Sequence, residues 1–337
     1  MANNFKSTYP FAAFGGKIDP LSEIRNAGIV TSGDVYWVKD PSDTSYVTVK
    51  DAVGADRLRD DIQSAIDLTA TDENDYVLVA PRDANTVWTI GTAIDIDKDR
   101  LHVLSVGYNR IAVGYGNTIR GFATTPAGTP VDASMIDITG AGVEFAGFRV
   151  LGTAGTSNGG TVTQVLRIGT DDPYVHDCSI EADDSASDTT LLGGPGTTIG
   201  GRFDNVKFSQ TGTADANTSL ITIPPAAVRW EFNDCDFYEH TSNVSDAFVT
   251  AGTGPTFYTN FNRCNFINSN IGTKSRSVVQ GSVTVDDGMI NLNYCTAQNV
   301  TDMGTDPSVH VAPVGSGTIP KLYNPGLSVG TIAVVAE

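Results

Sequence analysis

The sequence predicts an all-β fold, a right-handed parallel β-helix (solenoid) with an N-terminal capping helix, on three observations. The 337-residue chain is rich in turn residues, with 35 Gly and only 18% charged residues, a composition typical of β proteins. A short motif recurs every 28 to 31 residues, and all four cysteines fall at one position of that motif. A repeat of this length indicates coils that stack on one another.

The repeated motif is typical of a strand, a two-residue corner and a second strand. Val228, Trp230 and Phe232 alternate with polar residues before the corner, and Cys235 and Phe237 resume the alternation after it. This period of two predicts strands with one buried face. Six copies start 30, 28, 29, 29 and 31 residues apart, at Phe145, Val175, Phe203, Phe232, Phe261 and Leu292. Stacking such coils at the ~4.8 Å interstrand spacing buries their apolar faces.

An asparagine recurs at the corner of successive coils. Asn233, Asn262 and Asn293 hold this position, and Asp204 holds it one coil earlier. Asn and Asp tolerate the left-handed backbone conformation that a tight corner requires. We therefore expect these residues to turn the chain and to hydrogen-bond to one another as a ladder. The alternative is a chance alignment of unrelated turn residues.

The cysteines predict a structural role. Their spacings are coil lengths, with no CxxC pair and no column of histidines beside them, which argues against a metal site. Parallel stacked Cβ atoms fit disulfide geometry poorly. We expect reduced, buried thiols that serve as small apolar residues, and neither a metal nor another cofactor. The four are Cys178, Cys235, Cys264 and Cys295.

The solenoid needs covered ends, because exposed core and strand edges invite aggregation. An i, i+4 apolar stripe predicts a capping helix over residues 55–70. We assign 71–308 to the parallel β-helix and the apolar segment 309–337 to C-terminal closing strands.

Residues 1–54 read as an N-terminal arm followed by a hairpin. The hairpin is expected between Gly33–Val38 and Tyr46–Val49, on either side of Pro41. The arm before it is aromatic and aperiodic, and it is either a docking segment that orders on a partner or a segment packed on its own β-helix. Its candidate docking residues are Phe5, Tyr9, Phe11 and Phe14.

The charge balance excludes two classes of partner. With 21 Lys and Arg against 39 Asp and Glu, the formal charge is −18. Such a surface repels nucleic acid and anionic membranes, because binding phosphate requires clustered basic residues. The first residues, MANNFKSTY, have no apolar stretch, and no segment has the roughly 20 apolar residues that span a bilayer. We expect a protein made in a cytoplasm, with no membrane association.

Three segments together resemble the pectate-lyase-like β-helix superfamily. They are DDIQSAID at 60–67, NDYVLVAPRD at 74–83, and the repeated N-x-C-x-F corner, and the resemblance covers about residues 55–300. It implies a β-helix whose first coil is capped by a helix. Bacteriophage virion proteins, including tailspikes and capsid surface proteins, often use this fold, and enzymatic members of the superfamily cleave polysaccharides. A fold of this kind does not specify an activity.

Motifs of known active sites are absent from the sequence. The motif set of galacturonase-like members is missing, as are Walker, HExxH and zinc-finger spacings. Asp204 and Asp234 lie on neighbouring coils and form a candidate carboxylate pair for glycoside hydrolysis, but acidic residues abound in this chain. The histidines have no motif context: His102, His176, His240 and His310. The sequence therefore predicts a protein that is not an enzyme.

The resemblance and the missing motifs favour a non-enzymatic phage virion protein, either a capsid surface decoration or a short spike. It is expected to be a homotrimer, to be assembled in the host cytoplasm, to reside in the virion and to contact other virion proteins such as the major capsid protein. One alternative is a tailspike-type depolymerase that cuts a host surface glycan, with Trp230, Tyr238 and Tyr258 in its groove if these side chains face outward; the strand alternation places Trp230 toward the core. Another is a glycan- or receptor-binding module without turnover.

Overall fold

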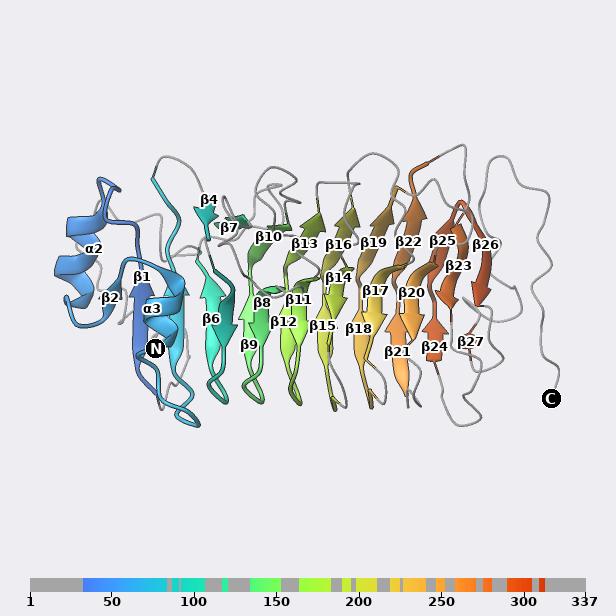
Figure 1. The fold of residues 1–337 in the computed structure, drawn as a ribbon, viewed down its shortest axis with the longest axis horizontal. Helices are drawn as coiled ribbons and strands as arrows, with labels where there is room; N and C mark the ends of the chain where they lie inside the picture. The colour runs from blue at the N-terminus through green and yellow to red at the C-terminus, as the bar shows by residue number, and fades with distance from the viewer. Residues whose placement is uncertain are drawn as a thin grey trace, which may run out of the picture.

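The protein forms a right-handed parallel β-helix whose coils stack along one axis (Figure 1). The computed structural model describes residues 33–83, 87–90, 92–106, 117–120, 134–152, 164–182, 190–194, 198–210, 219–224, 227–240, 247–251, 258–270, 275–280, 290–304 and 309–312. Within these residues every strand pair is parallel, and the strands form three sheets of eleven, eight and eight strands, here named sheets A, B and C. The predicted fold class is confirmed.

Successive coils contribute one strand each to the three sheets. Sheet A runs in the spatial order β2 (Leu58–Arg59), β1 (Val35–Val38), β3 (Tyr76–Val79), β6 (His102–Ser105), β9 (Glu144–Ala146), β12 (Tyr174–His176), β15 (Arg202–Asp204), β18 (Glu231–Asn233), β21 (Thr259–Asn262), β24 (Ile290–Asn293) and β27 (Val309–Ala312). Sheet B comprises β4 (Val87–Thr89), β7 (Asn117–Arg120), β10 (Phe148–Gly152), β13 (Ser179–Ala182), β16 (Lys207–Gln210), β19 (Asp236–Glu239), β22 (Asn265–Asn268) and β25 (Thr296–Gln298). Sheet C comprises β5 (Ile94–Ile96), β8 (Ser134–Ile138), β11 (Gln164–Ile168), β14 (Thr190–Gly193), β17 (Ser219–Ile223), β20 (Ala247–Ala251), β23 (Ser275–Gln280) and β26 (Val300–Gly304).

The core consists of aromatic and aliphatic side chains stacked from coil to coil. The Phe232 ring stacks on Phe203 with a centroid distance of 4.7 Å and on Phe261 with 4.6 Å. A parallel stack on sheet B joins Phe237 to Phe266 at 4.6 Å. All of these rings are fully buried. The in-register pairing of strands places like residues above one another, so the repeat of the sequence becomes a continuous apolar column.

The corner between sheets A and B differs from the prediction by one residue. The left-handed residue is the one that follows the asparagine position: φ is +55° at Asn205, +53° at Asp234, +55° at Arg263 and +57° at Tyr294. Asn233, Asn262 and Asn293 are instead the last residues of their strands. The prediction that these asparagines adopt the left-handed conformation is wrong, because they are still paired in the sheet A ladder and the chain turns only after the pairing ends.

The four cysteines are free and buried beneath this corner. Each thiol points to backbone carbonyl groups; the Cys235 Sγ, for example, lies 3.4 Å from the Phe203 oxygen and 3.4 Å from the Asn233 oxygen. Burial raises the pKa of Cys178 to about 12, so the thiol stays protonated and unreactive.

The N-terminal end of the core is closed by a helix that is shorter than predicted. Helix α3 (Ile62–Ile66) begins after Asp61, whose side chain accepts a hydrogen bond from the Ser64 amide, as an N-cap does. Ile62 and Ile66 pack into the main core. The prediction of a helix over 55–70 is wrong at its start, because Leu58 pairs with β1 in sheet A instead.

The predicted hairpin between residues 33 and 49 is also wrong. β1 pairs in parallel with β3, and the chain then forms helix α2 (Tyr46–Val53). Val49 and Val53, four residues apart, turn one helical face toward Trp37 in a second apolar cluster. The helical spacing of these valines outweighs the β propensity of the segment, because only a helix buries both of them on one side. The candidate docking residues Phe5, Tyr9, Phe11 and Phe14 lie outside the described residues, as does most of 309–337.

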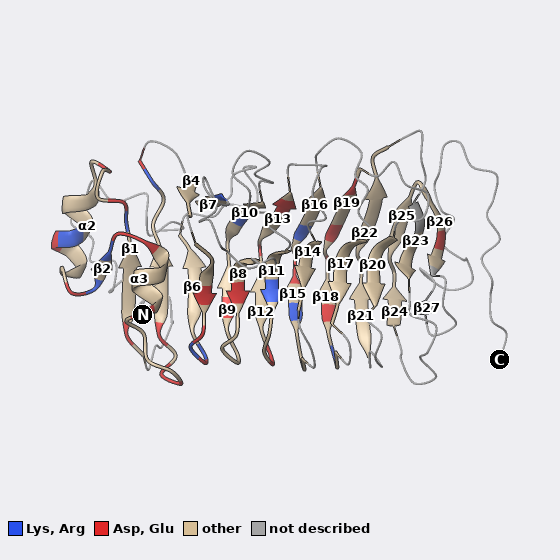
Figure 2. Cartoon of the chain, in the orientation of Figure 1, with Lys and Arg blue, Asp and Glu red and all other residues tan. Residues whose placement is uncertain are grey.

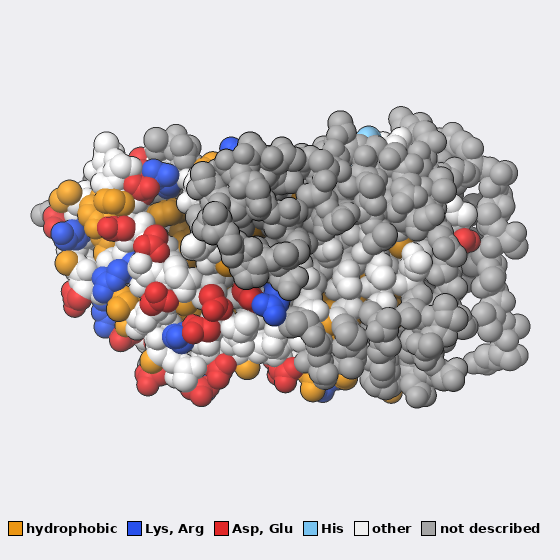
Figure 3. Space-filling view, viewed as in Figure 1, with side chains coloured by type: hydrophobic (Ala, Val, Ile, Leu, Met, Phe, Trp, Pro, Cys, Tyr) orange, Lys and Arg blue, Asp and Glu red, His pale blue; other side chains and the backbone are white. Residues whose placement is uncertain are grey.

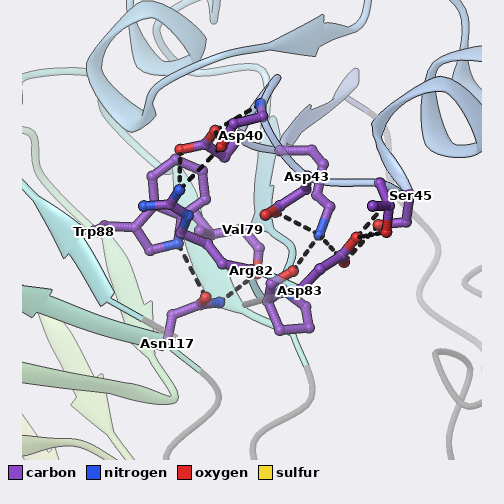
Figure 4. A network of polar contacts seen from close by, with 12 residues as sticks. Asp40, Asp43, Ser45, Val79, Arg82, Asp83, Trp88 and Asn117 are labelled. Carbon is purple, nitrogen blue, oxygen red and sulfur yellow. Dashed lines mark hydrogen bonds and ion pairs between the residues drawn. The ribbon is translucent and has the colours of Figure 1, made fainter. Parts of the chain in front are cut away.

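A buried ion network connects this N-terminal region to the first coil (Figure 4). The Lys39 ammonium lies 2.8 Å from Asp43 Oδ2, 2.8 Å from Asp83 Oδ1 and 2.5 Å from the Pro81 carbonyl oxygen. The side chains of Lys39 and Asp43 are only 3% and 2% exposed. Asp83 also accepts hydrogen bonds from the amide and hydroxyl groups of Ser45. The network therefore joins the segment after β1, the start of α2 and the segment after β3.

Candidate functional site

The outer face of sheet A carries a continuous column of polar side chains. Each strand turns its middle residue inward, so the residues on either side of it point to solvent. The strand registers align one outward column across neighbouring coils: Tyr76, His102, Glu144, Tyr174, Arg202, Glu231, Asn260 and Asn291. The first six residues of this column are ionisable, and the last two are amides. In Figure 2, β9, β15 and β18 carry charged residues, whereas β21 and β24 carry none.

Glu144 is the centre of the ionisable part of this column. Its Oε2 atom lies 2.5 Å from His102 Nδ1, and its Oε1 atom lies 2.8 Å from His176 Nε2. The other nitrogen of His176, Nδ1, lies 3.0 Å from Asp177 Oδ2. One carboxylate thus holds two imidazoles from the coils on either side of it, at side-chain exposures of 21–24%.

Aromatic rings fix the orientation of both imidazoles. The Tyr76 ring stacks on His102 with a centroid distance of 4.2 Å and an interplanar angle of 10°. The Tyr174 ring stacks on His176 at 4.4 Å and 25°. Packing of this kind restricts the rotamers of the histidines, so their ring nitrogens are held in place before any ligand arrives.

The hydrogen bonds determine the charge states of this group. Hydrogen bonds from His102 and His176 lower the pKa of Glu144 to about 2, against the opposing effect of burial. Burial also acts to lower the pKa of His176, but its hydrogen bonds to Glu144 and Asp177 outweigh burial and raise it. Near neutral pH Glu144 is therefore an anion, and His176 is a cation over a wider pH range than a free imidazole.

This arrangement supplies a positioned base. When His102 donates Nδ1–H to Glu144, its Nε2 atom carries the free lone pair. No group in the described part of the chain is hydrogen-bonded to that Nε2 atom. A histidine that a carboxylate orients in this way can act as a general base.

A second group lies one coil further along the sheet. The Tyr174 hydroxyl donates to Asp204 Oδ2 at 3.0 Å, and Arg202 lies 2.6 Å from the same oxygen. Burial and the bond to Asp204 raise the pKa of Tyr174 to about 12. Burial opposes the ionisation of Asp204, but hydrogen bonds from Arg202, Asn233 and Tyr174 outweigh it and lower its pKa. Asp204 is therefore a fixed anion rather than a proton donor.

Asp204 and Asp234, the candidate carboxylate pair for glycoside hydrolysis, are each held by other partners. Asp204 is held by the partners just described, whereas Asp234 forms a two-pronged ion pair with Arg263, with both N–O distances at 2.7 Å. General acid catalysis of glycoside hydrolysis needs one carboxyl group with a raised pKa. Asp204, whose pKa is lowered, does not meet this requirement.

The asparagine ladder runs along the second outward column of sheet A. Asn233 Nδ2 donates to Asp204 Oδ1 at 2.8 Å, Asn262 donates to Asn233 at 2.8 Å, and Asn293 donates to Asn262 at 2.9 Å. A parallel ladder joins Asn291 to Asn260 at 2.8 Å. The predicted interaction between stacked asparagines is present although the left-handed corner lies one residue later.

The aromatic residues considered for a glycan groove separate into two classes. Trp230 is fully buried in the core. Tyr238 lies under Lys207, whose Nζ is 5.4 Å from its ring centroid. Tyr258 is 56% exposed and Tyr294 is 54% exposed, at the two edges of sheet A on neighbouring coils.

The sequence analysis did not identify the group around Glu144. His102 and Glu144 are 42 residues apart in the chain although they are direct neighbours in the sheet. This coil is much longer than the others, so the 29-residue frame does not align the two residues. Their pairing depends on the register of β6 and β9, and the alternation of both strands was the only signal that pointed to it.

Two classes of feature are absent from the part of the chain that the structure describes. No group of three or more His, Cys, Asp or Glu side chains there is arranged to hold a metal ion. No helix there is long and apolar enough to cross a membrane.

Figure 3 shows acidic and basic side chains intermingled over the N-terminal part of the visible face.

Comparison with known proteins gives similarity of structure alone. No protein-family model and no curated protein sequence matches the chain. Pectin methylesterase from Aspergillus niger, in deglycosylated form, is 12% identical over 88% of this chain and 91% of that chain, with a TM-score of 0.49. A pectin methylesterase mutant in complex with a hexasaccharide is 16% identical over 82% and 80%, with a TM-score of 0.47. Pectin methylesterase from Erwinia chrysanthemi is 14% identical over 84% and 81%, with a TM-score of 0.48.

These similar structures contradict one prediction made from the sequence. Each of them is an enzyme, whereas the absence of known motifs predicted that this chain is not one. Missing motifs do not decide whether the chain is an enzyme, because catalytic groups on a β-helix meet across coils rather than within a short segment. At 12–16% identity and TM-scores below 0.5, the similarity does not assign a reaction to this chain.

Proposed function

We propose that the protein is a carbohydrate-active β-helix that hydrolyses ester groups on a polysaccharide. The observation that carries this proposal is the Glu144–His102 pair, with Nδ1 of the imidazole 2.5 Å from the carboxylate and Nε2 directed away from it. Ester hydrolysis needs a base that activates water, and a carboxylate-oriented histidine is such a base. Hydrolysis of a glycosidic bond would need a protonated carboxyl group, and the nearby carboxylates Glu144 and Asp204 have lowered pKa values.

The reaction follows from the positions of these groups. His102 Nε2 takes a proton from a water molecule as the water oxygen attacks the ester carbon. The same proton then passes to the leaving alkoxide, so the products are a carboxylic acid and an alcohol. His176, on the next coil, donates to the other oxygen of Glu144 at 2.8 Å and so holds in place the carboxylate that orients His102.

Two further observations support a polysaccharide as substrate. The outer face of sheet A is a long row of partly exposed hydroxyl, imidazole and amide groups along the solenoid axis, which suits an extended polymer with many hydroxyl groups. In addition, the sequence resembles a superfamily whose enzymatic members act on polysaccharides.

The test is the release of acid from ester-bearing polysaccharides. Purified protein is incubated with acetylated xylan and methyl-esterified pectin, and free acetate and methanol are measured beside new reducing ends. We expect release of acetate or methanol without new reducing ends. His102→Gln should lower kcat by about 10²–10⁴-fold. His240→Gln, at a histidine that follows β19 and contacts Ser269 just after β22, should leave kcat unchanged. New reducing ends without ester release would favour a depolymerase and refute the esterase.

The proposal also includes a location in a phage virion. The sequence resemblance supports a tailspike or capsid surface location in a virion, a homotrimer, and contact with the major capsid protein or a host surface glycan. The solution mass of the protein, measured with and without residues 1–20, tests the assembly. A trimer in both forms would place trimer contacts in the β-helix, and a monomer in both forms would remove the trimer from the proposal.

A further inference from the structure

Two exposed tyrosines occupy positions where the backbone disfavours them. Left-handed residues line both edges of sheet A, one column before the strands and one after them. In other coils these columns contain glycine, asparagine or aspartate, such as Gly142, Gly200 and Asn205, which adopt this conformation at low cost, and also three arginines, Arg100, Arg229 and Arg263. At Tyr258 and Tyr294 the same conformation, with φ of +57° in both, is adopted by a bulky side chain.

Neither tyrosine gains packing in return. Their exposed fractions are 56% and 54%, and neither ring stacks on another ring among the described residues. The arginine in a comparable position, Arg263, forms a two-pronged ion pair with Asp234. Arg229, one coil before Tyr258, shares the left-handed conformation, so the feature that distinguishes the two tyrosines is an exposed aromatic ring, which can pack against a ligand.

The two rings stand at opposite edges of a pair of strands that contain no charged residue. Tyr258 directly precedes β21 and Tyr294 directly follows β24, and these strands are neighbours in sheet A. Five residues at about 3.3 Å each separate the two positions along the strands, or about 16 Å. Between them lie four partly exposed amides: Asn260, Asn262, Asn291 and Asn293.

The amides are oriented in advance. The Asn262–Asn293 and Asn260–Asn291 hydrogen bonds fix the direction in which the nitrogen and the oxygen of each amide point. Each amide has two N–H groups and two acceptor lone pairs, so one donor and one acceptor per ladder bond remain available to a ligand. Fixing the groups beforehand lowers the entropy cost of binding.

We propose that this surface, here called the Tyr–Asn face, binds an uncharged polysaccharide. The two rings would stack on the apolar faces of sugar rings, and the amides would hydrogen-bond to hydroxyl groups between them. β21 and β24 contain no charged residue, and Arg263, the arginine that follows β21, is already paired with Asp234. The face therefore offers no unpaired cation to the carboxylates of a polyuronate, and the chain charge of −18 repels them. A protein partner would need a contiguous apolar centre, whereas these rings are separated by amides.

This inference rests on the proposed function and adds the class of glycan to it, but separate experiments can refute the binding site and the ester hydrolysis. His102→Gln should abolish ester release and leave binding at the Tyr–Asn face intact. The double variant Tyr258→Asn with Tyr294→Asn should lose binding and retain hydrolysis of a small soluble ester.

Affinity electrophoresis in gels containing dextran, galactomannan or alginate tests the inference. We expect at least one neutral polysaccharide to retard the wild-type chain, and alginate not to. The double tyrosine variant should bind at least about tenfold more weakly, with a Tm equal to or above that of the wild type, since asparagine relieves the backbone strain. Arg229→Asn, at a left-handed position in the column of Tyr258 one coil earlier, is the matched control and should bind as the wild type does.

Three outcomes would overturn the inference. If no neutral polysaccharide retards the wild-type chain, the proposed class of ligand is wrong. If the double variant is retarded as much as the wild type, the Tyr–Asn face is not the binding site. A loss of oligomer mass in the double variant would assign the face to a contact between copies of the chain instead.

Discussion

Replacing Lys39 with methionine tests whether the buried ion network holds the N-terminal region onto the solenoid. Methionine retains most of the volume of the lysine stem and removes only the charge and its donors. The substitution leaves Asp43, whose side chain is 2% exposed, without the ammonium that lies 2.8 Å from its Oδ2 atom.

The structure gives the magnitude of the effect. No other group in the described residues is hydrogen-bonded to Asp43 Oδ2, so the carboxylate would be buried and uncompensated. Removing one partner of a buried pair costs about 3–5 kcal/mol. Asp83, at 30% side-chain exposure, retains the Ser45 and Thr44 donors and adds less.

Hydrogen exchange measured by peptide mass spectrometry is the assay. In a solenoid each coil contacts only its neighbours, so local stability is lost locally. We expect much faster exchange in peptides from residues 33–60 of Lys39→Met and unchanged exchange in peptides from 227–268. Lys98→Met is the matched control, because Lys98 pairs with Asp97 on the surface and such pairs contribute at most about 1 kcal/mol.

Two results would refute this reasoning. Equal exchange in Lys39→Met and Lys98→Met would show that the buried network contributes no more than a surface pair. Stability should also recover when the second charge is removed. A Lys39→Met, Asp43→Asn double variant that is less stable than Lys39→Met alone would therefore show that an uncompensated carboxylate is not the cause of the loss.

The other predictions concern the Glu144 group and the core. Glu144→Gln should destabilise the protein most between about pH 4.5 and 6.5. The carboxylate of Glu144 contributes at most about 3 kcal/mol, because its pKa is lowered from 4.5 to about 2, and this contribution is lost as the pH falls toward 2. The pKa of His176 is raised, so the contribution of its ion pair is lost as the pH rises above 6.5. Urea midpoints across pH check this, and a pH-independent difference would contradict it. Phe232→Ala should cost about 3–5 kcal/mol in urea unfolding, because its ring stacks on both sides; a loss below about 1 kcal/mol would show a collapsed site. The cysteine thiols should react with a thiol reagent only after unfolding, and rapid native labelling of Cys178 would contradict its burial.

The sequence predicts the fold of this protein well where the coils have equal length. From Phe145 onward the 28- to 31-residue spacing places the apolar residues, the cysteines and the asparagines in columns, and parallel stacking permits only one register that keeps the apolar face buried. The same repeat predicts the contacts between Asn233, Asn262 and Asn293. Local pattern is sufficient there because each coil meets only the coils before and after it.

The details of the termini depend on tertiary contacts. Tyr46–Val49 has the composition of a strand, yet α2 forms because it packs Val49 and Val53 beside Trp37. Leu58 fits a helical stripe but joins sheet A, because β1 offers an open edge for pairing. In both segments the burial of one face against a distant part of the chain outweighs local propensity.

The candidate active site was decided by tertiary structure alone. His102, Glu144 and His176 come from three coils, and the first two are separated by an insertion that no fixed period spans. The sequence determined that polar residues would point outward from these strands. Only the register of β6, β9 and β12 determined which of them meet, because the hydrogen-bonded ladder, and not the distance along the chain, sets the neighbours of a side chain on a parallel sheet.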